Sequence, residues 1–469
     1  MNLNHDLWIE IFNYLTFKEK IECSKVCKEW YILQKYIYKN NKLKVTKKLF
    51  NSENFRLWFN KNKCLIEFDF KLLYKDLPKN MKEWVYKINF INIPNTDEFK
   101  QMKRLKELSI SNLKWNYFTN TISTLNNLTK LHVNNNVLKE LPESIGILNN
   151  LYELNLVNNE LKTLPDTIGN LSNLTNLHLD WNKLATIPES IGKLTKLKYL
   201  CVDNNILNSI PESIGEMINL NYLLLSGNRI NKLPNSIGNL NQLIGLNVAR
   251  NQLTILPKTI SQLKLLNNLC LTSNYITYLP QNIGDLNNLQ VLYINDNKLN
   301  QLPESICLLT KLQSLIIRNN ELTSLPENIG ELTNVKYLYS ENNRIQNIPD
   351  SIGNMKELIF VFLTNNFLSS IPESIGKLKK LSFLRLNINR IQSIPNSISE
   401  MEKLGELDLE SNRLAEIPVS IIEMEQLCKL ILRNNRIKHI PKRSGELSIL
   451  HIKIDEQTIC DKSKSMIVY

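Results

Sequence analysis

From residue 128 onward, the apolar residues of this 469-residue chain recur with a period of 23 residues. Each period opens with leucines at the spacing LxxLxL and continues to an asparagine and, six residues later, a proline. The first three periods are "LTKLHVNNNVLKELPESIGILNN", "LYELNLVNNELKTLPDTIGNLSN" and "LTNLHLDWNKLATIPESIGKLTK". In an extended segment the leucines of LxL point to one face and the residues between them to the other. The pattern therefore predicts one short strand per period.

The asparagine and the proline keep their places through fourteen periods, from Asn136 to Asn435 and from Pro142 to Pro441. A 23-residue unit cannot bury its own apolar face, so we expect the units to stack around a shared core. The asparagine amide can satisfy backbone groups where the chain turns. Proline, which has no N–H, suits a return segment outside the strand.

Glycine stands four residues after the proline, mostly behind an isoleucine, in ten of the fourteen units. A small residue at this point would ease a tight turn. The other four units carry Ser261, Cys307, Ser399 and Ile422 there. From these substitutes we expect the requirement for a small residue to be loose.

The pattern LxxLxLxxNxLxxLPxxIGxLxx resembles the leucine-rich repeat, in particular its cytosolic 23-residue form. The resemblance implies an α/β solenoid, a leucine-rich-repeat horseshoe with a parallel concave sheet. We expect leading units with strands in 65–73, 85–93 and 105–113, and a last strand in 447–455. About eighteen parallel strands would result, at roughly 4.8 Å each.

The first 33 residues do not follow the repeat. Leu3, Leu7, Ile11 and Leu15 recur every four residues, which predicts an amphipathic helix, and a second apolar group from Cys23 to Leu33 predicts another. These predictions make the N-terminus a small all-α head. A plain helical cap over the first repeat would also account for this apolar surface.

The head resembles an F-box, whose family phrase is approximately LPxELLxxILxYLxxxDLLxLSxVCxxW. The chain departs from it at Asn4, where the family has proline, and at Lys20, where it has leucine. The resemblance implies docking on a Skp-family adaptor of a cullin–RING ubiquitin ligase. The residues expected to bind the adaptor are Leu3, Asp6, Leu7, Ile11, Leu15, Val26 and Trp30.

These patterns divide the chain into four parts. Residues 1–48 are expected to form the F-box-like helical domain, and 49–104 a basic connector with degenerate leading repeats. Residues 34–64, which cross the boundary between these two parts, are expected to form a basic helical connector between the head and the solenoid. Residues 105–446 are the expected repeat solenoid, and 447–469 the last strand with a C-terminal cap.

The two positions flanking the second leucine of each unit face the concave surface in such a solenoid, where partners bind. Aromatic side chains gather there. Exposed aromatics in adjacent strands form an apolar patch of the kind that interfaces use, although aromatics also favour strands for their own packing. The expected target-binding residues are Trp181, Tyr199, Tyr222, Tyr293, Tyr337, Tyr339, Phe360, Phe362 and Phe383.

The net charge is +12, from 57 Lys and Arg against 45 Asp and Glu. Beyond the aromatic positions lies a basic rim, Arg385, Arg390, Arg413, Arg433 and Arg436, interspersed with Glu406, Asp408 and Glu410. Mixed signs favour a charged protein partner over a nucleic acid. No apolar run is long enough to cross a bilayer, so no membrane partner is expected.

For catalysis the best candidate is His178 beside Cys201 in neighbouring strands, which could in principle activate a thiolate. An open sheet face offers no enclosed pocket or oxyanion donors, so we expect no catalytic residue. His132 and His178 lie too far apart to share a metal ion without further ligands. The sequence predicts a chain that is not an enzyme and has no metal or cofactor.

The eight cysteines are scattered and form no CxxC, which favours a reducing compartment. We expect the cytoplasm, with the nucleus as the alternative. The Asn-, Lys- and Ile-rich composition is typical of AT-rich genomes such as those of amoebae or of large viruses that infect them. In the viral case the location would be the host cytoplasm.

Two functions remain open. In the first, the F-box docks the ligase adaptor and the concave face presents a target for ubiquitin transfer. In the second, the chain is a scaffold that binds a signalling protein such as a small GTPase, and the head is only a cap.

Overall fold

The structure is a computed structural model that describes residues 43–45, 66–73, 85–92, 100–442, 450–456, 459–460 and 466–468. The expected helical head and its adaptor-binding residues, from Leu3 to Trp30, lie outside the described residues. The chain divides into two compact units, Met1–Leu184 and Ala185–Tyr469, which are described separately below.

In the first unit, seven described strands form a parallel ladder in chain order. They are β1 (Leu43–Val45), β2 (Ile66–Leu73), β3 (Val85–Asn92), β4 (Glu107–Ser109), β5 (Lys130–His132), β6 (Glu153–Asn155) and β7 (Asn176–His178). β2 and β3 lie where the leading strands were predicted, although the register between them shifts. The prediction of a helix over 34–64 is wrong at 43–45, where the chain forms the strand β1 and pairs with β2. This pairing satisfies backbone N–H and C=O groups of β2 that would otherwise stay unpaired at the edge of the sheet.

In the second unit, thirteen described strands form a parallel ladder. They are β8 (Tyr199–Cys201), β9 (Tyr222–Leu224), β10 (Gly245–Asn247), β11 (Asn268–Cys270), β12 (Val291–Tyr293), β13 (Ser314–Ile316), β14 (Tyr337–Tyr339), β15 (Phe360–Phe362), β16 (Phe383–Arg385), β17 (Glu406–Asp408), β18 (Lys429–Ile431), β20 (Leu450–Lys453) and β22 (Met466–Val468). β19 (His439–Ile440) and β21 (Ile459–Cys460) form a separate parallel pair. β20 lies within the predicted last strand, 447–455.

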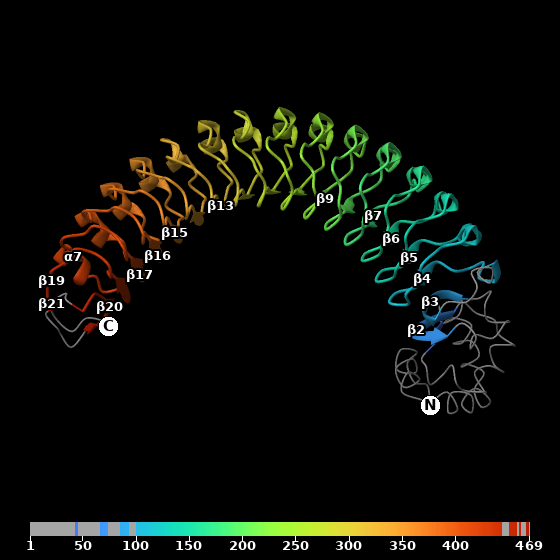
Figure 1. Cartoon of the computed structure of the whole chain (residues 1–469), viewed down its shortest axis with the longest axis horizontal. Coiled ribbons are helices and arrows are strands. Elements are labelled where there is room, and N and C mark those ends of the chain that lie inside the picture. Colours follow the sequence, from blue (N-terminus) through green and yellow to red (C-terminus); the bar gives the residue numbers. More distant parts are fainter. Residues whose placement is uncertain are drawn as a thin grey trace, which may run out of the picture. The chain divides into compact units, whose positions relative to one another are not determined.

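The return segment of each repeat carries a short helix on the side of the coil opposite the strand (Figure 1). The 3-10 helices of the first unit are η3 (Asn120–Thr124), η4 (Glu143–Ile147) and η5 (Asp166–Asn170). Those of the second are η6 (Glu189–Lys193), η7 (Glu212–Glu216), η8 (Asn235–Asn239), η9 (Lys258–Gln262), η10 (Ile283–Asp285), η11 (Glu304–Leu308), η12 (Ile329–Glu331), η13 (Asp350–Asn354), η14 (Glu373–Lys377) and η15 (Asn396–Glu400), followed by the α-helix α7 (Val419–Ile422). Proline precedes most of these helices, and its carbonyl accepts the first helical bond, as Pro142 does from the Ile145 N–H.

The leucines of each period are buried in a continuous core, and the repeated asparagine holds neighbouring coils together. In Asn297 the Nδ2 group donates to the carbonyls of Leu271 at 3.0 Å and of Ile294 at 3.1 Å. Its Oδ1 accepts from the Ile276 N–H at 3.0 Å. The same bonds recur from coil to coil within each unit, so the amide satisfies buried backbone groups of two repeats, as predicted.

The residue before each ladder asparagine has a positive φ, from Asn135 at 58° to Asn434 at 56°. Asparagine and glycine tolerate this left-handed conformation, which costs other residues roughly 1–2 kcal/mol. Two large apolar residues nevertheless occupy it, Trp181 and Ile388, both at φ 57°. For a β-branched residue this is a true conformational outlier.

The glycine after the isoleucine, which the sequence predicts to be loosely required, lies close to the backbone of the next coil. An added Cβ on Gly330 would lie 2.1 Å from the Ser351 carbonyl oxygen of the next coil. After Ser261 and Cys307 the following coil carries Asn282 and Asn328 in place of serine or threonine, and its helix is three residues long instead of five. A changed turn in the next coil thus accompanies Ser261 and Cys307. Ser399, and Ser123 at the equivalent position before the first regular unit, are followed by coils that keep serine.

This coupling predicts the outcome of a double-mutant cycle. Gly330→Cys alone should cost about 1–3 kcal/mol of unfolding free energy, because the thiol side chain overpacks the turn. Adding Ser351→Asn, which copies the Cys307 and Asn328 arrangement, should recover at least half of that cost. Urea unfolding of the four proteins measures the interaction energy, and strict additivity would contradict the coupling.

Candidate functional site

Five aromatic side chains occupy the exposed positions of three neighbouring strands, β14, β15 and β16. We call Tyr337, Tyr339, Phe360, Phe362 and Phe383 the aromatic strip. In the parallel register Tyr337 lies opposite Phe360 and Tyr339 opposite Phe362, while Phe383 continues the first row. The two rows flank the buried core residue of each strand.

The rings of the aromatic strip stack on one another along the sheet. The centroids of Tyr339 and Phe362 are 4.8 Å apart with an interplanar angle of 9°. Phe360 stacks on Phe383 at 4.9 Å and 8°, and it meets Phe362 edge-on at 5.9 Å. The side chains are half-buried or exposed, so the rings form a continuous apolar surface with fixed orientations.

Charged groups border the strip at β16 to β18. The Arg385 guanidinium lies 4.7 Å from the centroid of the Phe362 ring, a cation–π contact. It also forms an ion pair with Glu406 at 3.2 Å, and Lys429 pairs with the same carboxylate at 3.1 Å. Arg385 and Lys429 therefore share one carboxylate, and the three groups leave one net positive charge at the edge of the aromatic rows.

Beside the strip, Glu341 places a carboxyl group in unfavourable surroundings. Its Oε2 atom is buried without a hydrogen-bond partner among the described residues, and so is the Ser340 Oγ next to it. Burial raises the pKa of Glu341. Burial, and then the charge of Glu341, also raise the pKa of Tyr339. Two polar groups that the fold does not satisfy thus adjoin Tyr339.

The raised pKa makes Glu341 a source of pH-dependent stability. The folded state binds this proton more tightly than the unfolded chain, so the stabilisation is present at acidic pH and is lost as the pH rises through the raised pKa. Glu341→Gln should therefore raise stability at pH 7 and change it little at pH 4. Urea unfolding at both pH values tests this, with exposed Glu327→Gln as the control. An equal effect of Glu341→Gln at both pH values would contradict it.

The remaining residues of the predicted target-binding set fall into separate places. Tyr199 and Tyr222 lie on adjacent strands with centroids 6.1 Å apart. Tyr293 lies two strands before Tyr339, and Ile316 lies between them in the same row. Trp181 belongs to the first unit, where it is 60% exposed. All four residues therefore lie outside the aromatic strip, and only Tyr199 and Tyr222 contact each other through their rings.

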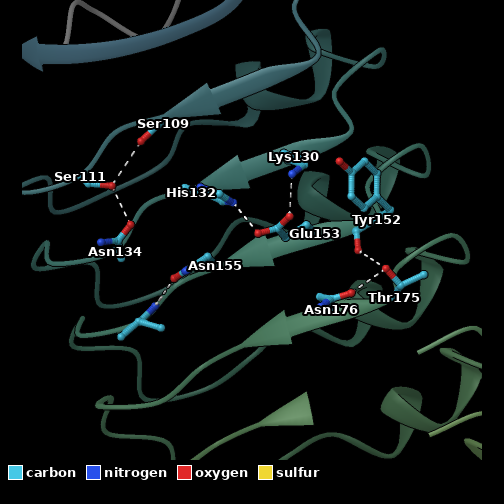
Figure 2. Close-up of polar contacts among 11 residues, drawn as sticks. Ser109, Ser111, Lys130, His132, Asn134, Tyr152, Glu153, Asn155, Thr175 and Asn176 are labelled. Atoms are coloured by element: carbon cyan, nitrogen blue, oxygen red, sulfur yellow. Dashed lines mark hydrogen bonds and ion pairs between the residues drawn. The ribbon is translucent and has the colours of Figure 1, made fainter. Parts of the chain in front are cut away.

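The corresponding face of the first unit is polar (Figure 2). Glu153 lies between Lys130 and His132, with its Oε2 3.1 Å from Lys130 Nζ and its Oε1 2.9 Å from His132 Nε2. Hydrogen bonds to Tyr152 and then Glu153 raise the pKa of Lys130. Burial opposes ionisation of Glu153, but Lys130 and His132 outweigh it and lower its pKa. Polar neighbours continue along the face at Ser109, Ser111, Asn134, Asn155, Thr175 and Asn176.

The described residues offer little support for chemistry. His178 lies in the first unit and Cys201 in the second, and Cys201 is only 6% exposed. Burial lowers the pKa of His178, so its imidazole is neutral at pH 7 and supplies no charge to a thiolate. Burial raises the pKa of the Cys307 thiol to about 12. Among the described residues no three His, Cys, Asp or Glu side chains cluster as metal ligands, and no described helix is long and apolar enough to span a membrane.

Two features of this site were missed from the sequence. Glu341 and Ile388 both carry a cost that the fold does not explain: a buried carboxylate oxygen and a strained backbone. The signal for Ile388 was available, because most repeats have asparagine, glycine or serine at that position. The signal for Glu341 was absent, since its burial comes from neighbouring coils.

Comparison with known proteins agrees with the repeat. A family model of a leucine-rich repeat region matches residues 84–205, 185–274 and 266–338. No curated protein matches the sequence significantly. Among solved structures, the leucine-rich-repeat protein LIC12759 of Leptospira interrogans is 35% identical, with a TM-score of 0.67, over 74% of this chain and 88% of that chain.

Two plant structures are also similar. The structure of PEPR1 with AtPEP1 is 26% identical, with a TM-score of 0.68, over 83% of this chain and 58% of that one, so this chain spans little more than half of it. The ectodomain of the Arabidopsis receptor kinase HAESA, in complex with an IDA peptide hormone, is 25% identical, with a TM-score of 0.65, over 83% of this chain and 74% of that chain.

These matches show that the chain belongs to the leucine-rich-repeat family. An F-box domain model matches residues 1–42, the predicted head. The chain is thus an F-box/leucine-rich-repeat protein. Both regions are typically non-catalytic, and the chain is a protein-interaction module.

Proposed function

We propose that this chain is a substrate receptor of an SCF-type ubiquitin ligase. Its F-box would dock a Skp-family adaptor, and the aromatic strip would bind a protein target. The observation that carries the proposal is the stacked, solvent-accessible strip on a chain that also has an F-box match. Aromatic side chains of this kind are frequent anchors of protein interfaces.

In this role the chain performs no bond-making step. It holds a lysine of the target near the charged conjugating enzyme of the ligase, so that an intermolecular transfer gains from proximity. The rigidity of the stacked coils serves this purpose, because each ladder asparagine fixes its coil to the one before it. Such a role belongs in the cytoplasm, or in the nucleus.

Capture of the adaptor tests the proposal. A purified Skp-family adaptor should capture the full-length chain, and Leu7→Glu with Ile11→Glu should reduce that capture by more than about tenfold, because two anchors of the apolar face become charged. Asn13→Glu with Lys18→Glu, at polar positions of the same segment, is the matched control and should capture normally.

Two results would favour the scaffold function instead. One is no adaptor capture by the unaltered chain. The other is capture that the Leu7 and Ile11 substitutions leave unchanged. In either case the head would serve only as a cap, while target binding by the strip could still hold.

A further inference from the structure

A row of arginines lies on the flank of the second unit, one residue after the ladder asparagine. Arg390, Arg413 and Arg436 occupy this position in three successive coils, and we call them the arginine flank. The backbone N–H groups of Arg390, Arg413 and Arg436 donate to Leu368, Ile391 and Leu414 of the coil before, so the three residues follow one another along the stack. All three side chains are exposed.

The guanidinium groups of the flank have no carboxylate partner within the described part of the chain. In an earlier pair of coils the same row holds an ion pair, Arg344 with Glu321 at 3.1 Å. Among the described residues, by contrast, no carboxylate forms an ion pair with any of the flank arginines. With coils roughly 4.8 Å apart, neighbouring like charges of the flank lie well within one Debye length of about 8 Å. An acidic ligand would relieve this repulsion.

An apolar edge adjoins the flank. Phe367 precedes Arg390 in the same row, and the Arg390 guanidinium lies 4.2 Å from its ring centroid. Ile388, two residues before Arg390, is 49% exposed in the left-handed conformation. Phe367 and Ile388 thus expose apolar surface beside a row of cations.

Ile388 also interrupts a polar ladder on the surface. Asn319, Asn342 and Asn365 occupy the same position in preceding coils. The Nδ2 of each donates to the side-chain oxygen at the equivalent position one coil earlier, at 2.5, 2.6 and 2.9 Å respectively. Isoleucine has no group that could continue these bonds. The residue is strained and exposed, and its side chain ends the ladder. Strain of this kind concentrates at functional positions.

We propose that the arginine flank, together with Phe367 and Ile388, docks an acidic, extended segment of the target protein that carries an apolar side chain. The inference rests on the proposed function in that the segment belongs to the target held by the aromatic strip. Carboxylates would pair with the guanidinium groups, and the apolar side chain would cover Ile388. A nucleic acid fits less well, because its phosphate backbone offers no aliphatic side chain to cover the exposed Ile388.

Fluorescence anisotropy with the full-length chain tests this at about 0.15 M salt. The probes are a short labelled glutamate-rich peptide with one central leucine, the same peptide with serine for leucine, and a short single-stranded oligo-dT. We expect the leucine peptide to bind best. Arg413→Gln with Arg436→Gln should weaken it by about tenfold, whereas Lys232→Gln with Lys258→Gln, exposed lysines of other coils with the same charge change, should leave it within about twofold.

Ile388→Asn separates the apolar contact from the charges. It should raise the melting temperature, because asparagine accepts the left-handed conformation, and yet weaken the leucine peptide by roughly threefold. Binding of the serine peptide should not change. A variant that is more stable and binds less well cannot be explained by damage to the fold.

Three results would overturn the inference: no binding of either peptide, binding that survives the arginine substitutions, or tighter arginine-dependent binding of oligo-dT. Adaptor capture, measured on the same arginine variant, should be unchanged. A chain that binds the peptides but not the adaptor would keep the docking surface and lose the ligase role, so the two failures are distinguishable.

Discussion

Asn320→Ala should destabilise the second unit by about 3–5 kcal/mol, because it removes a buried amide that four backbone groups use. Its Nδ2 donates to the carbonyls of Ile294 and Ile317 at 3.0 Å and of Arg318 at 3.2 Å. Its Oδ1 accepts from the Leu299 N–H at 3.0 Å. Alanine would leave these groups buried and unsatisfied in two adjacent coils.

The neighbouring Asn319 provides the matched control. It has the left-handed backbone, φ 56°, and its side chain is exposed. Asn319→Gly keeps that conformation accessible and removes only surface hydrogen bonds, so we expect a loss below about 1 kcal/mol. Urea unfolding followed by circular dichroism measures both. Equal losses for the two variants would show that the buried ladder does not hold the coils together.

The second large effect concerns the target. Tyr339→Ala with Phe362→Ala should reduce target affinity by roughly 100-fold, since it removes a stacked pair from the middle of the strip. Stability should fall much less, because neither side chain is fully buried. Tyr117→Ala with Tyr278→Ala removes two exposed tyrosines elsewhere and is the control. A target retained by the strip variant and lost by the control would exclude the strip as the binding surface.

The regular coils were predictable because one physical requirement repeats at every step. The leucines of LxL and the ladder asparagine each have a single role, so strands such as β12 and β15 begin and end where the pattern places them. The concave positions followed from the same alternation, which brought Tyr339 beside Phe362.

Other features depend on contacts between coils that one period does not contain. The turn in the coil after Cys307 is three residues long, and at equivalent glycines an added Cβ would meet the next coil. The burial of Glu341 likewise comes from its neighbours. β1 joins the ladder through an open edge of β2, which the local sequence "LKV" gives little reason to expect. The identity of the adaptor-binding residues, from Leu3 to Trp30, stays a prediction.

The central claim is that one chain links a ligase adaptor to a target through two separate surfaces. An adaptor pull-down in cells that express the chain, quantified by mass spectrometry, tests it most directly when the unaltered chain is compared with Tyr339→Ala/Phe362→Ala. We predict equal recovery of the chain by the adaptor in both cases, with a small set of proteins present only with the unaltered strip. Failure of the adaptor to recover the chain, or the same accompanying proteins with both chains, would contradict the account.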